Sequence, residues 1–161
     1  MSKFHLRIPV KAGIKEIYKI ISTSAGIESW FLRSAKFLTK DTSPRPHEST
    51  VSVDDTYEWK WHGYSDFIVE HGTILEVKEN SLVKFTFTDN CIVTFEISEE
   101  AGETIFTITQ ENIPPDANPE TNLYIGCQLG WTFYMTNLKS ILEGGIDMRN
   151  KNEKLEKVVN A

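Results

Sequence analysis

The feature that most constrains the fold is a sustained alternation of apolar and polar residues from Val51 to Gln110. Successive side chains of a β-strand point to opposite faces of a sheet, so this alternation is typical of strands that are buried on one face. Short segments rich in turn-forming residues interrupt it, such as TDN at 88–90 and SEEAGE at 98–103. Because strands that are joined by short turns pair side by side in opposite directions, the sequence predicts an antiparallel meander.

A strand and two short helices are predicted before the meander. Residues 3–10, KFHLRIPV, alternate between apolar side chains and polar or charged ones, which predicts a half-buried strand. Apolar residues at spacings of three and four then predict one short helix around 14–21 and a second around 27–31. Residues 41–50, DTSPRPHEST, have the composition of a surface loop.

Residues 66–77, DFIVEHGTILEV, are too many for one strand with uninterrupted alternation of apolar and polar side chains. The phase of this alternation changes around Gly72, which predicts a bulge or a sharp bend there. His71 has the parity of Val69 and is predicted to point inward beside this bend, whereas Asp66 and Glu70 are predicted to face solvent. An inward histidine can act as a general base, orient a ligand or hydrogen-bond to the backbone within the core.

A long C-terminal helix, predicted from about Glu120 to Glu143, contains two glycines in its interior. A glycine costs a helix interior about 1 kcal/mol relative to alanine. Gly126 and Gly130 lie along the edge of the apolar face that is expected to pack on the sheet, beside Asn137. Either they allow close packing against a neighbouring backbone, or they leave space and form one wall of a cavity. The apolar face itself comprises Leu123, Cys127, Trp131, Tyr134, Leu138 and Ile141.

A second apolar stripe, Ile125, Leu129 and Phe133, lies on nearly the opposite side of this helix. Either the two short helices cover the stripe or a partner subunit does. The short helices are the expected cover, because they need a surface on which to pack.

Composition and motifs bound the class of function. The 161 residues carry a formal charge of −6, which argues against a nucleic-acid surface or an anionic-membrane surface. No nucleophile elbow, phosphate-binding glycine loop or HExxH motif occurs, and the histidines and cysteines lack metal-ligand spacing, so no cofactor and no metal are expected. The N-terminus has no apolar signal-peptide core, so a cytoplasmic protein is expected, with Cys91 and Cys127 as free thiols.

The predicted order of a strand, two short helices, a six-strand antiparallel run and a long C-terminal helix is that of the helix-grip fold. Three stretches make the match more specific: ESWF at 28–31, YEWKWHGY running into HGTILEVKENSLVKFTF, and GWTFYMTNLKSILEGG at 130–145. The sequence resembles START-like proteins of the SRPBCC superfamily, most of all the branch called activator of heat-shock-protein-ninety ATPase homologue-like. The resemblance covers Phe4 to about Gly145. It implies an α+β, START-like fold in which a curved antiparallel sheet wraps around the long helix, with two short helices after the first strand.

The resemblance also implies an apolar pocket between the long helix and the sheet. Members of the superfamily bind lipids, polyketides or other hydrophobic small molecules, some are cyclases or aromatases, and one group stimulates the ATPase of a stress-response chaperone. We therefore predict the binding of a small hydrophobic molecule. The alternatives are an interaction domain like the chaperone activators and a cyclase/aromatase-type enzyme that uses the same pocket. The family has no universal catalytic motif, so no catalytic residue is predicted.

The predicted ligand contacts are aromatic residues and a few residues that supply polar groups or space. They are Trp30, Trp59, Trp61, His71, Phe85, Phe95, Cys127, Gly130, Trp131, Tyr134 and Asn137. The tryptophans can instead fill the core, which is the commoner role of large aromatic residues.

The expected partners are a small apolar molecule and, in the alternative role, a chaperone. Neither nucleic acid nor stable membrane insertion is expected, and the chain is expected to be a monomer or a weak dimer. One domain is expected over residues 1–146, followed by a charged, frayed tail over 147–161.

Overall fold

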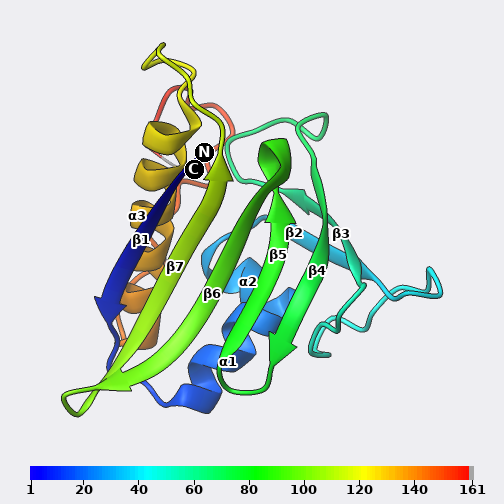
Figure 1. Cartoon of the computed structure of the whole chain (residues 1–161), viewed down its shortest axis with the longest axis vertical. Helices are drawn as coiled ribbons and strands as arrows, with labels where there is room; N and C mark the ends of the chain where they lie inside the picture. Colours follow the sequence, from blue (N-terminus) through cyan, green and yellow to red (C-terminus); the bar gives the residue numbers. More distant parts are fainter. Residues whose placement is uncertain (160–161) are drawn as a thin grey trace.

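The computed structural model describes residues 1–159 and contains one seven-stranded sheet flanked by helices (Figure 1). Every neighbouring pair of strands is antiparallel, and the strand order is β1-β7-β6-β5-β4-β3-β2. The predicted helix-grip fold is confirmed. Along the chain the elements are β1 (Ser2–Pro9), α1 (Ile14–Ser22), α2 (Ser24–Trp30), β2 (Ser34–Leu38), β3 (Thr56–Lys60), β4 (Glu70–Lys78), β5 (Leu82–Phe87), the 3₁₀ turn η1 (Thr88–Asn90), β6 (Cys91–Glu100), β7 (Glu103–Ile113) and α3 (Leu123–Leu142).

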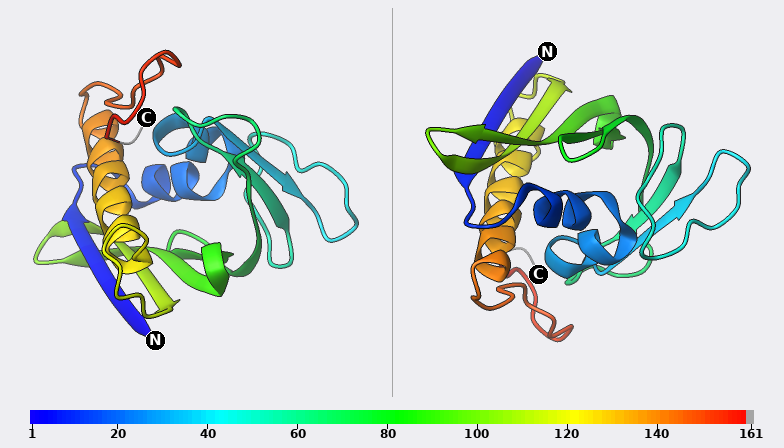
Figure 2. Two further views of the ribbon diagram at one scale, coloured as in Figure 1. Left: turned by 90° about the horizontal axis from the view of Figure 1, so that it is seen from above. Right: turned by 90° about the horizontal axis from the view of Figure 1, so that it is seen from below.

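The sheet curves around the helices, as the two end-on views in Figure 2 show. The helix α3 packs on β1 and β7, whereas α1 and α2 pack on each other and lie against β5, β6 and β2. Large side chains from α2 and from the inner faces of four strands fill the space between these layers. The bulkiest of them are fully buried: Trp30, Phe31, Trp59, Phe85, Phe95 and Phe106.

The turns between the strands lie where the sequence predicts them. The TDN segment forms η1, in which Asp89 and Asn90 both adopt positive φ. Ala101 and Gly102 adopt positive φ in the turn between β6 and β7. These left-handed conformations reverse the chain within a few residues, and asparagine, aspartate and glycine adopt them at low cost.

The predicted bend at Gly72 is wrong in its position. Gly72 lies in regular pairing with Tyr57, and the irregularity in β4 falls between Ile74 and Glu76. A Cβ atom at residue 72 would overlap the ring of Tyr57. Glycine is therefore needed at this point because an aromatic ring covers the backbone, and not because the strand turns.

The short helices α1 and α2 do not cover the outer face of α3. Ile125 and Leu129 are 42% and 67% exposed, because α1 and α2 pack inside the curve of the sheet and not against the outer side of α3. The expectation that the short helices cover this stripe is wrong for Ile125 and Leu129, whereas Phe133 is partly buried against the core. Among residues 1–159, no helix is both long enough and apolar enough to cross a membrane.

Candidate functional site

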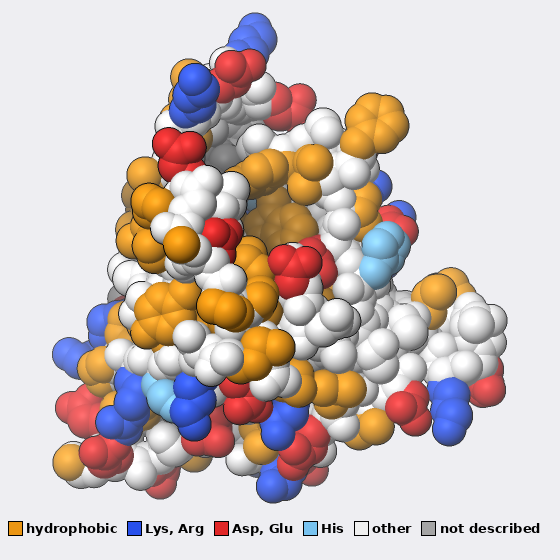
Figure 3. Space-filling view, turned by 45° about the horizontal axis from the view of Figure 1, so that its top comes forward, with side chains coloured by type: hydrophobic (Ala, Val, Ile, Leu, Met, Phe, Trp, Pro, Cys, Tyr) orange, Lys and Arg blue, Asp and Glu red, His pale blue; other side chains and the backbone are white. Residues whose placement is uncertain are grey.

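A pocket of about 290 Å³ opens between α3, the ends of β4 and β5, and the loop that follows β3. In the space-filling view it is a hollow with a hydrophobic interior and acidic side chains at its rim (Figure 3). Four separate segments of the chain contribute its walls. The lining residues are Phe31, Trp61, Tyr64, Ile68, Glu70, Phe87, Thr88, Cys127, Gly130, Trp131 and Tyr134.

Aromatic rings form most of the pocket wall, and Phe31 lies at their centre. Its ring centroid is 4.9 Å from those of Trp131 and Tyr134 and 6.0 Å from that of Trp61. The planes of these rings are inclined to Phe31 by 48°, 67° and 75° respectively. Rings that are inclined in this way form a cup, whereas parallel rings would stack and leave no space between them.

A buried hydrogen bond holds Trp131 in position. Its indole Nε1 donates to Oε1 of Gln110 at 2.8 Å, and Gln110 is fully buried on β7. Because a polar atom that is buried without a partner is costly, this bond disfavours other orientations of the indole. The pocket wall is therefore preformed on the α3 side.

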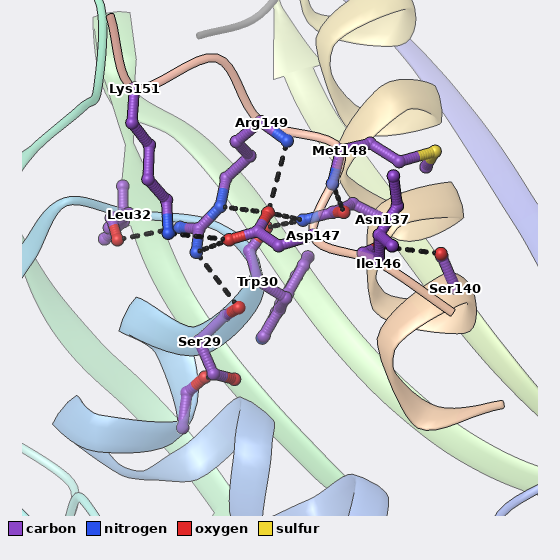
Figure 4. Close-up of polar contacts among 11 residues, drawn as sticks. Ser29, Trp30, Leu32, Asn137, Ser140, Ile146, Asp147, Met148, Arg149 and Lys151 are labelled. Carbon is purple, nitrogen blue, oxygen red and sulfur yellow. Dashed lines mark hydrogen bonds and ion pairs between the residues drawn. The ribbon is translucent and has the colours of Figure 1, made fainter. Parts of the chain in front are cut away.

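The backbone that carries Phe31 is tied to α3 and to the segment after it (Figure 4). Asn137 Nδ2 donates to the carbonyl of Trp30 at 2.9 Å. The guanidinium of Arg149 donates to the carbonyls of Leu32 and Ser29, both at 3.0 Å. These bonds cap the C-terminal end of α2 and hold the floor of the pocket against α3.

Arg149 lies within the predicted frayed tail, yet it is only 7% exposed. Its guanidinium pairs with Asp147, whose Oδ1 also accepts from Asn137 at 3.1 Å. The first residues of the predicted tail are thus docked against α2 and α3, and residues 160–161 of that tail lie outside the described chain. The division of the chain at residue 146 stays a prediction.

Glu70 supplies the single charged group among the described lining residues. It is half-buried at the first position of β4, where it pairs with Trp59 on β3. Burial raises the pKa of its carboxyl above the usual value, the nearby charge of Asp89 raises it further, and His71 opposes the shift. A carboxyl with a raised pKa can bind a hydrogen-bond donor or a cation, and it can also exchange a proton with a bound molecule.

The structure reverses the predicted orientations of His71 and Glu70. His71 is exposed and pairs with Glu58, in a shallow groove on the outer face of the sheet. The prediction counted parity from Val69, but the strand begins only at Glu70, so the residues before it do not define which face is buried. His71 therefore lies outside the pocket.

The remaining predicted contacts fall into two groups. Five of them line the pocket: Trp61, Cys127, Gly130, Trp131 and Tyr134. Five others belong to the buried core or to its hydrogen bonds and do not reach the pocket surface: Trp30, Trp59, Phe85, Phe95 and Asn137. Whether any of them binds a ligand stays a prediction.

Six lining residues were not predicted as ligand contacts, and they are Phe31, Tyr64, Ile68, Glu70, Phe87 and Thr88. Phe31 and Phe87 carry a visible signal, because both are large aromatic residues at the ends of predicted elements. Tyr64 lies in the loop before β4, outside the periodic patterns, and Ile68 has the parity of Asp66 and Glu70, which were predicted to face solvent.

Both cysteines are free thiols, as predicted. Cys127 lines the pocket, and burial raises the pKa of its thiol. A neutral thiol is a weak nucleophile, so the raised pKa disfavours Cys127 as a nucleophile. Within residues 1–159, no group of three or more His, Cys, Asp and Glu side chains is placed to hold a metal ion.

Comparison with known proteins gives one family. The model of the family described as Activator of Hsp90 ATPase homolog 1-like protein matches residues 11–143. Among curated proteins, none matches this sequence.

Several solved structures have the same fold. A Staphylococcus saprophyticus protein is 18% identical with a TM-score of 0.71, and the match covers 92% of this chain and 96% of that one. The Aha1 dimer from Colwellia psychrerythraea is 15% identical with a TM-score of 0.67, covering 96% and 100%. A Bacillus halodurans protein is 20% identical with a TM-score of 0.64, covering 88% and 97%. At these identities the likeness concerns the fold alone.

Proposed function

The chain belongs to the family of Activator of Hsp90 ATPase homolog 1-like proteins, and we propose that it binds a small hydrophobic molecule in the pocket between α3 and the sheet. The observation that carries this proposal is a preformed, aromatic-walled pocket of about 290 Å³. Its rings are held in place by buried hydrogen bonds to Gln110 and to the backbone around Phe31.

The size of the pocket limits the ligand. Its volume of about 290 Å³ lies at the lower end of the range of small-molecule sites, which begins at about 300 Å³. An apolar cavity of about 150 Å³ is large enough for benzene. The ligand is therefore expected to have about the bulk of two fused or linked six-membered rings.

A protein-interaction role is the second candidate. The observation that favours it is the exposed stripe of Ile125 and Leu129 on the outer side of α3. This stripe lies away from the cup of aromatic rings, so the two roles can be tested separately.

Filling the pocket tests the first candidate. Gly130 lines the pocket, so Gly130→Leu is expected to place its side chain in the cavity and to abolish binding of the neutral two-ring fluorophore 1-methylnaphthalene. Gly126→Leu is the matched control, because Gly126 is exposed one turn earlier on the same helix and a Cβ atom there meets open space within 4 Å. Both leucines also remove a helix-interior glycine, which favours the helix by up to about 1 kcal/mol.

The expected result is that the control binds the probe as the wild type does and that both variants unfold at or above the wild-type temperature. Retained probe binding in Gly130→Leu would contradict the proposal. Native mass spectrometry of protein purified from its own host then identifies the small molecule that occupies the pocket.

A further inference from the structure

The chemistry of the pocket wall selects one class of hydrophobic molecule. Six of the eleven lining residues are aromatic: Phe31, Trp61, Tyr64, Phe87, Trp131 and Tyr134. The face of an aromatic ring carries partial negative charge, and several inclined faces around one space attract a cation. Aliphatic walls would bury apolar surface equally well without this preference.

Glu70 adds a full negative charge to the same space. It is half-buried, and it forms no ion pair with any residue between 1 and 159. None of the described lining residues is Lys, Arg or His, so nothing positive in the wall neutralises it. A half-buried carboxylate without a partner is costly, and a cationic ligand would remove that cost.

The electrostatic surroundings are negative as well. Asp89, in the turn at the end of β5, is close enough to Glu70 to raise the pKa of its carboxyl. The chain as a whole carries a charge of −6. An anionic ligand would therefore meet repulsion at the rim of the pocket and again at its wall.

We propose that the pocket binds an apolar monocation, with an ammonium-type group held between the Glu70 carboxylate and the aromatic rings. This inference rests on the proposed function and narrows it to a ligand class. A zwitterion such as a phosphocholine headgroup fits less well, because its phosphate would find no cationic partner among the described lining residues.

A pair of ligands with the same shape isolates the charge. Phenyltrimethylammonium and tert-butylbenzene differ only in whether nitrogen or carbon carries the three methyl groups, and both are small enough for about 290 Å³. Benzenesulfonate and 4-(trimethylammonio)benzoate, which keep the size of the first two ligands, supply the anionic and zwitterionic arms. Binding is measured at pH 7.5 from the indole N–H signals of Trp61 and Trp131 in ¹H–¹⁵N spectra, because both indoles belong to lining residues.

The wild type is expected to bind phenyltrimethylammonium about ten-fold or more tightly than tert-butylbenzene. Glu70→Gln is expected to lose most of this preference while it still binds tert-butylbenzene. Glu58→Gln is the matched control, since it removes the same charge from the neighbouring strand on the outer face, and it is expected to behave as the wild type.

The outcomes separate the two proposals. Equal binding of the cation and tert-butylbenzene, a preference for the sulfonate or the zwitterion, or an unchanged preference in Glu70→Gln overturns the monocation and leaves the hydrophobic pocket standing. Failure of every ligand to shift either indole signal overturns both proposals. If Glu70→Gln does not fold, the ratio of the two wild-type affinities decides alone.

Discussion

Replacing Arg149 with alanine removes the side chain that joins the C-terminal segment to the floor of the pocket. The guanidinium donates to the carbonyls of Leu32 and Ser29 and forms a two-point pair with Asp147. Only 2% of its side chain is exposed, so water cannot take over these bonds in the folded protein. The alanine variant leaves two backbone carbonyls without this donor, whereas Asp147 keeps its contacts with Asn137 and Lys151.

The magnitude follows from the burial of each partner. A hydrogen bond to a charged group contributes about 1.5–3 kcal/mol, and breaking a fully buried ion pair costs about 3–5 kcal/mol. Asp147 is 24% exposed and can regain water, which places the cost of Arg149→Ala at the lower end, at about 2–4 kcal/mol of unfolding free energy. For a chain of this size that loss lowers the unfolding temperature by about 5–15 °C.

Denaturant unfolding of Arg149→Ala and Lys151→Ala measures this difference. Lys151 also pairs with Asp147, at 2.9 Å, but its side chain is 55% exposed, so its removal is expected to cost less than about 1 kcal/mol. Arg149→Ala is also expected to weaken probe binding, because the backbone it holds carries Phe31. Equal, small losses in the two variants would refute the conclusion that residues 147–149 hold the pocket floor.

Three further predictions concern glycine packing and two ionisable groups. Gly26→Ala is expected to lower the free energy of unfolding by about 1–3 kcal/mol or more, because a Cβ atom there would overlap the backbone of α1. Gly126→Ala meets open space and is expected to raise it by up to about 1 kcal/mol. Denaturant unfolding curves that shift in the same direction for both variants would contradict this. Glu70→Gln is expected to stabilise the fold at pH 7.5, because the folded pKa of this carboxyl is raised and its ionised form is disfavoured. Thermal unfolding at a series of pH values should show that this gain in stability disappears below the usual carboxyl pKa of 4.5. The hydrogen bond from His47 to Glu28 raises the pKa of His47. The contribution of this pair to stability is therefore full below pH 6.5 and is lost as the pH rises through the folded pKa. Unfolding curves of His47→Gln, measured between about pH 6 and 8, should lack this loss of stability.

The strands and the long helix could be predicted because their patterns are long and regular. The alternation from Val51 to Gln110 admits few other folds, and the predicted helix from about Glu120 to Glu143 differs from α3 by three residues or fewer at each end. Local periodicity decides such elements, since the buried face of each is defined by many residues at once. A single misplaced residue does not change the outcome.

The pocket could be predicted only in part, because the difference between core and cavity wall is a property of tertiary packing. Trp59 and Trp61 lie on the same strand face in the sequence pattern, yet Trp59 is fully buried and Trp61 lines the pocket. Trp61 lies just beyond the end of β3, where the sheet no longer covers it. No spacing rule marks that boundary.

The sequence also left open whether Gly126 and Gly130 allow close packing or form the wall of a cavity, and only the structure distinguishes these alternatives. Gly126 is exposed and a Cβ atom there meets open space, so close packing does not explain it. Gly130 lines the pocket, which agrees with the cavity alternative at that position. Residues one turn apart on the same helix edge therefore have different surroundings.

Two features that cost stability meet at this pocket. Gly130 interrupts a helix interior, and Glu70 places a carboxyl in a half-buried position. Natural sequences follow the local rules of propensity and burial over most of a fold. Departures from those rules concentrate where function requires them. Since a ligand that is both apolar and positively charged would fill the space beside the glycine and pair with the carboxylate, one bound molecule would offset both costs together.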